Sequence, residues 1–169
     1  MHGRSRIIGT AIAATLIAAA FALVPAPDDA NALPTVNVSA ISAGRFHTCA
    51  VSLGGVSCWG DNELGTLGNN STEASRVPVA VVGLASGVAA VSAGGSHTCA
   101  LKDGGVWCWG SSGLGMLGIN STESCGASPC IRAPAPVPGL APGVTAISAG
   151  LFHPCAGKDG GAYCWGYND

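Results

Sequence analysis

Charged and aromatic residues are scarce in this sequence. Charged residues make up 9% of the chain and aromatic residues 5%, and the formal net charge is −2 at pH 7. So small a charge excludes the strongly basic surface with which proteins bind nucleic acid or an acidic membrane. Strongly periodic apolar helices are absent after residue 32, whereas 26 glycines and 10 prolines are present. This composition predicts an all-β, loop-rich domain.

The N-terminal segment has the layout of a secretory signal peptide. Arg4 and Arg6 precede an apolar run over residues 7–24, and Ala30-Asn31-Ala32 provides a small-x-small cleavage site. We expect cleavage before Leu33, which leaves residues 33–169 as a secreted, periplasmic or cell-surface domain that no longer contacts the membrane. An uncleaved membrane anchor is the alternative, because the apolar run approaches spanning length.

All eight cysteines lie after the predicted cleavage site. An even number of cysteines behind a signal peptide predicts disulfides. Structural zinc is the competing interpretation, but the repeated nine-residue step lacks the short Cys-x2-Cys spacing of zinc sites. We therefore predict no metal and four disulfides: Cys49–Cys58, Cys99–Cys108, Cys155–Cys164 and, within an insertion, Cys125–Cys130.

The stretch from residue 97 to residue 110 has the pattern of a β-hairpin. Two runs of β-favouring residues flank Asp103-Gly104, which suits the positive φ angles of a two-residue type I′ turn. With the turn centred there, Cys99 faces Cys108 in a non-hydrogen-bonded pair, where Cα atoms approach to about 4.5 Å. A disulfide can bridge that distance.

The hairpin recurs as part of a longer repeat. The step from Cys49 to Cys99 is 50 residues, and the step from Cys99 to Cys155 is 56, with the extra residues in the segment that holds Cys125 and Cys130. Each unit offers four strand candidates, for example residues 88–93, 97–101 and 106–110, and a weaker proline-containing run such as residues 77–82. Four short strands per unit of about 50 residues indicate β-propeller blades.

The repeated motifs resemble those of the regulator of chromosome condensation repeat. Each is followed by a Trp-Gly pair, and the motifs are Ser42-Ala43-Gly44-x-x-His47, Ser92-Ala93-Gly94-x-x-His97 and Ser148-Ala149-Gly150-x-x-His153. The first copy continues from Trp59 to Gly68 in a form close to the family's W-G-x-N-x-x-G-Q-L-G. Thr66 and Met116 replace the family's Gln, and Ser112 replaces its Asn in the second copy.

The resemblance implies a seven-bladed β-propeller. We divide the chain into repeats at about 36–87, 88–143 and a truncated 144–169, which is about two and a half blades and an incomplete ring. The chain is then either a fragment of a longer protein or an open arc. In both cases we expect further repeats, from the same longer chain or an oligomer, to be needed to close the ring, because open blades leave faces uncovered.

Few residues stand apart from the repeat as candidates for function. His47, His97 and His153 recur once per unit, which favours a structural hydrogen-bonding role over a metal or catalytic one. Trp59, Trp109 and Trp165 are in register and are expected to pack between blades, each pointing away from the neighbouring disulfide. Trp107 has Ser57 and Tyr163 as counterparts, so Trp107 and Tyr163 are the aromatic residues we predict to contact a partner.

The sequence contains no nucleophile–base pair and no paired carboxylates outside the repeat. We therefore expect a secreted, disulfide-stapled, non-catalytic module that binds an unknown protein partner and carries no cofactor. The resemblance implies two alternatives. One is guanine-nucleotide exchange on a small GTPase, the activity of the family's chromatin-bound namesake, and the other is an exported enzyme inhibitor of propeller type.

Overall fold

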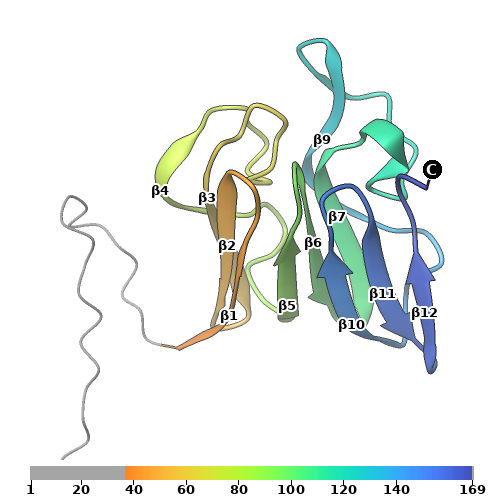
Figure 1. Cartoon of the computed structure of the whole chain (residues 1–169). Coiled ribbons are helices and arrows are strands. Elements are labelled where there is room, and N and C mark those ends of the chain that lie inside the picture. Colours follow the sequence, from red (N-terminus) through yellow and green to blue (C-terminus); the bar gives the residue numbers. More distant parts are fainter. Residues whose placement is uncertain (1–36, 169) are drawn as a thin grey trace, which may run out of the picture.

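Three antiparallel sheets follow one another along the chain and stand side by side (Figure 1). The computed structural model describes residues 37–168, so the predicted signal peptide lies outside the described residues. We call the sheets blades 1, 2 and 3. Blade 1 contains β1 (Val38–Ala43), β2 (His47–Ser52), β3 (Gly55–Gly60) and β4 (Ser75–Ala80). Blade 2 contains β5 (Val88–Ala93), β6 (His97–Lys102), β7 (Gly105–Ser111), β8 (Ser124–Cys125) and β9 (Ser128–Pro136). Blade 3 contains β10 (Val144–Ala149), β11 (Pro154–Lys158) and β12 (Gly161–Cys164).

Each blade is a meander in which strands that follow in sequence pair in space, except that in blade 2 the strand β9 pairs with β7 and β8 pairs with the outer side of β9. The orders are β1-β2-β3-β4 in blade 1, β5-β6-β7-β9-β8 in blade 2 and β10-β11-β12 in blade 3. The insertion adds β8, which pairs with the start of β9, and a short 3-10 helix, η1 (Gly113–Gly115), precedes it. The fourth strand of blade 1 spans Ser75–Ala80, two residues earlier than the run expected over 77–82.

The central hairpin of each blade has the register that its sequence predicts. In blade 2, Cys99 pairs with Cys108 and Ala100 with Trp107. Asp103 (φ 50°) and Gly104 (φ 74°) both have positive φ, as a type I′ turn requires. The first and second strands of every blade also share one irregularity, a register shift after their first residue pair.

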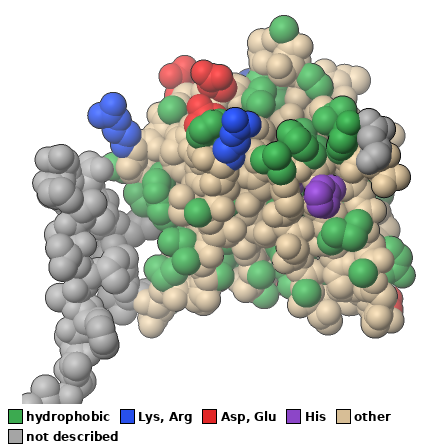
Figure 2. Space-filling view, in the orientation of Figure 1, with side chains coloured by type: hydrophobic (Ala, Val, Ile, Leu, Met, Phe, Trp, Pro, Cys, Tyr) green, Lys and Arg blue, Asp and Glu red, His purple; other side chains and the backbone are tan. Residues whose placement is uncertain are grey.

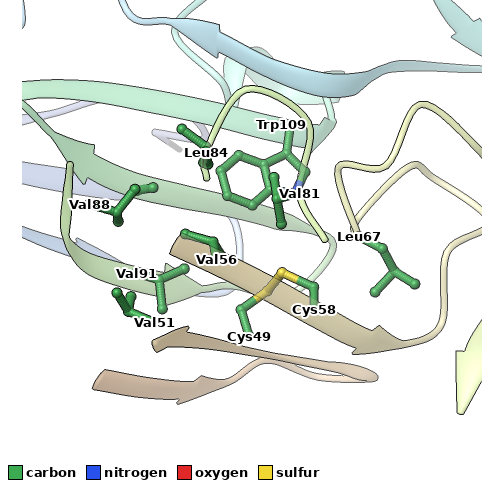
Figure 3. Packing of buried hydrophobic residues seen from close by; sticks show 11 residues of the cluster. Cys49, Val51, Val56, Cys58, Leu67, Val81, Leu84, Val88, Val91 and Trp109 are labelled. Atoms are coloured by element: carbon green, nitrogen blue, oxygen red, sulfur yellow. A yellow bond between two sulfur atoms is a disulfide. The ribbon is translucent and has the colours of Figure 1, made fainter. Parts of the chain in front are cut away.

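The hydrophobic core lies between the blades rather than within one sheet. The cluster in Figure 3 joins Cys49, Val51, Val56 and Cys58 of blade 1 to Val88, Val91 and Trp109 of blade 2, with Val81 and Leu84 from the turn that connects them. A second cluster joins blades 2 and 3 in the same way. Burial of each such valine or leucine contributes about 1.5–3 kcal/mol. A blade therefore buries its apolar face only where a neighbouring blade is present.

All eight cysteines form disulfides, in the pairs that the sequence predicts. The three hairpin disulfides each join Cα atoms 4.1 Å apart, and the Cys125–Cys130 bridge of the insertion joins Cα atoms 5.7 Å apart. The hairpin bridges of blades 1 and 2 lie beneath the following blade and are almost fully buried. In blade 3 no described blade follows, so Cys164 is exposed.

This difference in burial predicts an order of reduction. A reductant needs access to a sulfur atom, so Cys155–Cys164 should open before the three buried bridges. Brief treatment with a thiol under native conditions, followed by alkylation and peptide mass spectrometry, should label Cys155 and Cys164 first. Labelling of Cys49 and Cys58 at the same rate would contradict the burial of the blade 1 bridge.

Candidate functional site

A tryptophan from each following blade is hydrogen-bonded to a loop of the preceding blade. The indole Nε1 of Trp109 donates to the carbonyl oxygen of Thr66 at 2.8 Å, and that of Trp165 donates to Met116 at 3.1 Å. Thr66 and Met116 are equivalent residues in the loops after β3 and β7. Trp59 belongs to blade 1, which no described blade precedes, and it is only half-buried. Trp109 and Trp165 thus pack between blades as expected, whereas for Trp59 the packing stays a prediction, because no described blade precedes blade 1.

Glycine at the end of each acceptor loop makes room for the indole. A Cβ atom at Gly68 would lie 2.7 Å from Nε1 of Trp109, and one at Gly118 would lie 3.0 Å from Cδ1 of Trp165. Both glycines also have positive φ, 66° and 64°. The glycine at the end of the motif therefore leaves the space in which the indole ring of the next blade packs.

A buried asparagine shapes the acceptor loop of blade 1. The amide nitrogen of Asn62 donates to the carbonyl oxygens of Ser71 and Glu73, both at 3.0 Å. Its Oδ1 accepts the N–H of Leu67 at 2.9 Å. Blade 2 has Ser112 at this position, and there the loop forms the short 3-10 helix instead.

Two further contacts repeat between the blades. The hydroxyl oxygen of Ser42 accepts the N–H of Ala93 at 3.0 Å, and that of Ser92 accepts the N–H of Ala149 at 2.9 Å. The serine and alanine of the Ser-Ala-Gly motif therefore face opposite neighbours, so each blade presents an acceptor to the next and a donor to the previous one.

His47 links blades 1 and 2 through two consecutive hydrogen bonds. Its Nε2 lies 2.8 Å from Oγ1 of Thr98, and the Thr98 hydroxyl donates to the carbonyl oxygen of Thr66 at 3.1 Å. Because the hydroxyl hydrogen is used in that bond, Nε2 of His47 carries a hydrogen and donates to Thr98. Burial lowers the pKa of His47 to about 4, against the opposing attraction of Asp61. These contacts fit the structural role predicted for this histidine.

His97 occupies the equivalent position in blade 2 but has lost its partner. It is fully buried, yet neither ring nitrogen has a hydrogen-bond partner among the described residues. The residue of blade 3 equivalent to Thr98 is Pro154, which has no hydroxyl group. Burial first, and then the charges of His47 and His153, lower the pKa of His97 from 6.5 to about 4.

The two aromatic residues predicted to contact a partner lie at equivalent positions on neighbouring blades. Trp107 on β7 is half-buried, and the ammonium group of Lys102 lies 5.8 Å from the centre of its ring. Tyr163 on β12 is 50% exposed. Neither takes part in the tryptophan–carbonyl bonds between blades, so both stay candidates for contact with a partner.

Sequence reasoning missed a second group of exposed apolar side chains, at the turns that precede the histidines. Phe46 is 62% exposed with the Arg45 guanidinium 4.7 Å from its ring centre. In blade 3, Leu151 and Phe152 occupy the same turn, and Phe152 packs edge-on against Tyr167. Figure 2 shows apolar side chains gathered on the side of the molecule where blade 3 lies. The sequence signal for this group was the two variable positions between the glycine and the histidine of each motif, which hold Arg45-Phe46 in blade 1 and Leu151-Phe152 in blade 3.

Residues 37–168 contain no group of three histidine, cysteine, aspartate or glutamate side chains able to hold a metal ion. No helix in the same range is long and apolar enough to span a membrane.

The repeated sheets, with cores between them, are blades of a β-propeller. Residues 54–101 and 103–156 match the family model of the regulator of chromosome condensation (RCC1) repeat, and residues 38–66 and 88–115 match a second model of the same description. The first model covers more than half of the chain. The chain therefore belongs to the RCC1 repeat family.

Solved structures share this fold. Human WBSCR16 superimposes with a TM-score of 0.66 at 22% identity, over 75% of this chain and 32% of that chain. Yeast RCC1 (Prp20), solved bound to Kap60, gives a TM-score of 0.66 at 24% identity, over 77% and 32%. Prp20p from Saccharomyces cerevisiae gives 0.64 at 22%, over 77% and 33%. This chain thus spans about a third of the length of these proteins. No curated protein sequence matches it significantly.

Replacement of the two tryptophans of β7 should have unequal effects. Trp109 is fully buried between blades, and loss of a buried tryptophan side chain costs about 3–5 kcal/mol. Trp107 is half-buried and its indole N–H donates to no loop carbonyl of a neighbouring blade. Trp107→Ser should therefore lower the free energy of unfolding clearly less than Trp109→Ala. Denaturant unfolding of Trp109→Ala and Trp107→Ser measures both free energies. Equal destabilisation would remove the distinction between the two positions.

Pro154 in blade 3 offers a test of the hydrogen bond between a histidine and the hydroxyl group of the next blade. Pro154→Thr should restore a hydroxyl between His97 and the carbonyl oxygen of Met116, and a net hydrogen bond contributes about 1 kcal/mol. A double-mutant cycle with His97→Ala isolates this term from the loss of proline rigidity. We expect Pro154→Thr to be more favourable by about 1 kcal/mol when His97 is present. Equal effects in both backgrounds would show that no such bond forms.

The lowered histidine pKa values predict a pH dependence of stability. Well above pH 6.5, for example at pH 7.5, both histidines are largely neutral in the folded and the unfolded chain. As the pH falls from 6.5 towards 4, the unfolded chain binds protons that the folded chain does not, so the free energy of unfolding decreases. His97→Gln should reduce this slope, since glutamine does not titrate. Denaturant unfolding at pH 7.5, 6, 5 and 4.5 compares the variant with the native chain, and parallel curves would contradict the prediction.

Proposed function

We propose that this chain is a secreted, disulfide-stapled propeller module that binds another protein and carries out no catalysis. The observation that carries the proposal is the exposure of large apolar side chains at equivalent places in the repeat, Phe46 and Phe152 at the turns and Tyr163 on a strand. Exposed apolar patches on a folded domain are typical of interaction sites. The disulfides support export, because such bonds persist in oxidising compartments.

Trp107 and Tyr163 are the residues we propose to touch the partner. Tyrosine and tryptophan are common in the energetically dominant centres of protein interfaces. The low net charge of the chain, −2, fits a contact that is mainly apolar rather than electrostatic. Such a module needs no nucleic acid and no membrane.

Further repeats would complete the propeller. Trp59 is half-buried where Trp109 is fully buried, and Ile41 on β1 is 66% exposed. Both lie on blade 1, which has no described neighbour on one side. Repeats from a longer form of the chain or from an oligomer would cover this side.

The alternatives remain weaker. Yeast RCC1 (Prp20) was solved bound to Kap60, and a second structure of Prp20p describes its binding to Gsp1p and histones. A comparable role in GTPase regulation would require this disulfide-rich chain to work in the reducing cytosol, where such bonds are rare. An exported enzyme inhibitor is compatible with the disulfides and would be one form of the protein-binding role.

Expression of the full chain with a C-terminal tag in a secreting host tests the proposal. We expect the tag outside the cytosol, on a chain that begins at Leu33, with all cysteines oxidised. The tagged chain should retain a defined protein from the extracellular fraction, and Trp107→Ser should weaken this retention while Ser57→Ala does not. A chain kept in the cytosol with reduced cysteines would overturn the proposal and favour GTPase regulation.

A further inference from the structure

Blade 2 carries an insertion that blade 1 lacks. The sequence of residues 119–124 corresponds to that of residues 69–74, and residues 131–139 correspond to residues 75–83. The six residues between the two matched ranges of blade 2 are Cys125–Cys130. The insertion is therefore the loop that the Cys125–Cys130 disulfide closes.

The sheet keeps its register on both sides of this insertion. In blade 1 Cys58 of β3 pairs with Val79 of β4, and in blade 2 the corresponding Cys108 of β7 pairs with Ala135 of β9. The turn before the insertion is also shared. In both blades the N–H of a glutamate donates to the hydroxyl oxygen of the serine two residues earlier, at 2.9 Å in blade 1 and 3.1 Å in blade 2. The outer strand thus pairs without help from the insertion, and an added surface loop that the fold does not need is a common place for a binding function.

The inserted hairpin is nevertheless held in one conformation. Its short strand β8 pairs with the start of β9, and both cysteines of its disulfide are buried. The N–H of Cys130 donates to the carbonyl oxygen of Glu123 at 3.2 Å, and the N–H of Ser112 donates to that of Pro129 at 3.1 Å. A loop that is already fixed loses little conformational entropy when it binds a partner.

The tip of this hairpin is exposed and uncharged. Residues 126–129, Gly-Ala-Ser-Pro, are all exposed. Figure 1 shows the hairpin before β9 standing out beyond the other loops at that end of the molecule. The charged residues that flank the insertion, Glu123 and Arg132, face each other with 3.9 Å between Oε2 and Nε. The tip therefore offers small side chains and no charge of its own.

Leu114 lies beside the hairpin and is 57% exposed. It belongs to η1, which contacts β9, and a Cβ atom at the adjacent Gly113 would lie 3.9 Å from Cγ of Pro129. Its φ of 57° falls in the left-handed region, which is unfavourable for a leucine. The corresponding Leu64 of blade 1 is half-buried and does not have a positive φ. Strained residues of this kind cluster at functional sites.

We propose that the inserted hairpin and Leu114 together enter a concave, uncharged site on a folded partner protein. A projecting hairpin with small side chains at its tip fits a hollow better than a flat surface. A charged hollow would lose its hydration against this tip without gaining an ion pair, so the partner site is uncharged. The proposal rests on the proposed protein-binding function and adds to it a surface and the kind of partner site that the surface fits.

A membrane is a poorer occupant of this surface. Interfacial binding needs a broad apolar face, usually with basic residues that attract anionic lipids. Leu114 is a single large apolar side chain, and Arg132 is the only lysine or arginine between residues 103 and 157. The Arg132 guanidinium already faces Glu123.

Site-specific crosslinking identifies the occupant. The full chain carries the photoreactive residue p-benzoylphenylalanine in place of Ala127 and is irradiated in the extracellular fraction of the secreting cells. The matched control carries the same residue in place of Leu53, which is 77% exposed at the turn between β2 and β3, at the opposite end of the strands. We expect one defined protein to be crosslinked from position 127 and not from position 53. Mass spectrometry of the crosslinked peptides identifies this protein and the site on it.

Binding of the purified partner is then measured by calorimetry. Deletion of residues 125–130 gives blade 2 the loop length of blade 1, and Leu114→Gly removes the side chain at a backbone angle that suits glycine. We expect each variant to weaken binding about ten-fold or more. The midpoint of denaturant unfolding should not fall for Leu114→Gly, so the loss is one of contact and not of folding. Leu53→Ser is the control and should bind like the native chain.

Several results would overturn the proposal. These are crosslinking from position 127 only to lipid or to a second copy of the chain, no crosslink at all, or unchanged binding of the Leu114→Gly or the deletion variant. An equal loss of binding in Leu53→Ser would also contradict it. A deletion variant that retains the extracellular partner fully, while Trp107→Ser does not, keeps the proposed function and loses only this site.

Discussion

The structure depends on one interaction, the hydrogen bond from an indole N–H to a main-chain carbonyl of the preceding blade. Trp109 donates to Thr66 across the first interface and Trp165 to Met116 across the second. An indole N–H buried without an acceptor would cost about 1–3 kcal/mol, so the ring can be buried only where the loop supplies its carbonyl. The loop glycine, the buried Asn62 and the hairpin disulfide all hold one of the two partners in place. Each blade therefore specifies how its neighbour must sit.

This dependence on neighbours explains the differences among three similar blades. Where a described blade follows, the hairpin disulfide is covered, and where one precedes, the tryptophan donates its indole N–H to a loop of that blade. Where none is described, Trp59 has no indole acceptor among residues 37–168 at one end, and Cys164 is exposed at the other. The second interface is also less complete than the first, because Pro154 leaves His97 buried without a hydrogen bond.

The sequence was informative wherever a feature is local or repeated. The Asp103-Gly104 turn and the nine-residue cysteine step define the hairpin register, and the in-phase motifs define blades of a propeller. The burial and hydrogen bonding of the Trp59 indole could not be predicted, because both depend on a neighbouring blade that the Trp59 repeat does not contain. The unpaired nitrogens of His97 were also missed, since the partner is lost through Pro154, 57 residues away. The contacts of Trp107 and Tyr163 with a partner remain predictions.

Hydrogen exchange of the four indole N–H groups, followed by NMR on the oxidised chain, tests the central interaction most directly. Trp109, which is fully buried and bonded to Thr66, should exchange slowest, and Trp165 should also be protected through its bond to Met116. Trp59 and Trp107 should exchange much faster, because neither has an indole acceptor among the described residues. Protection of Trp59 equal to that of Trp109, or exchange of Trp109 at the rate of a free indole, would contradict the dependence of each blade on the loop before it.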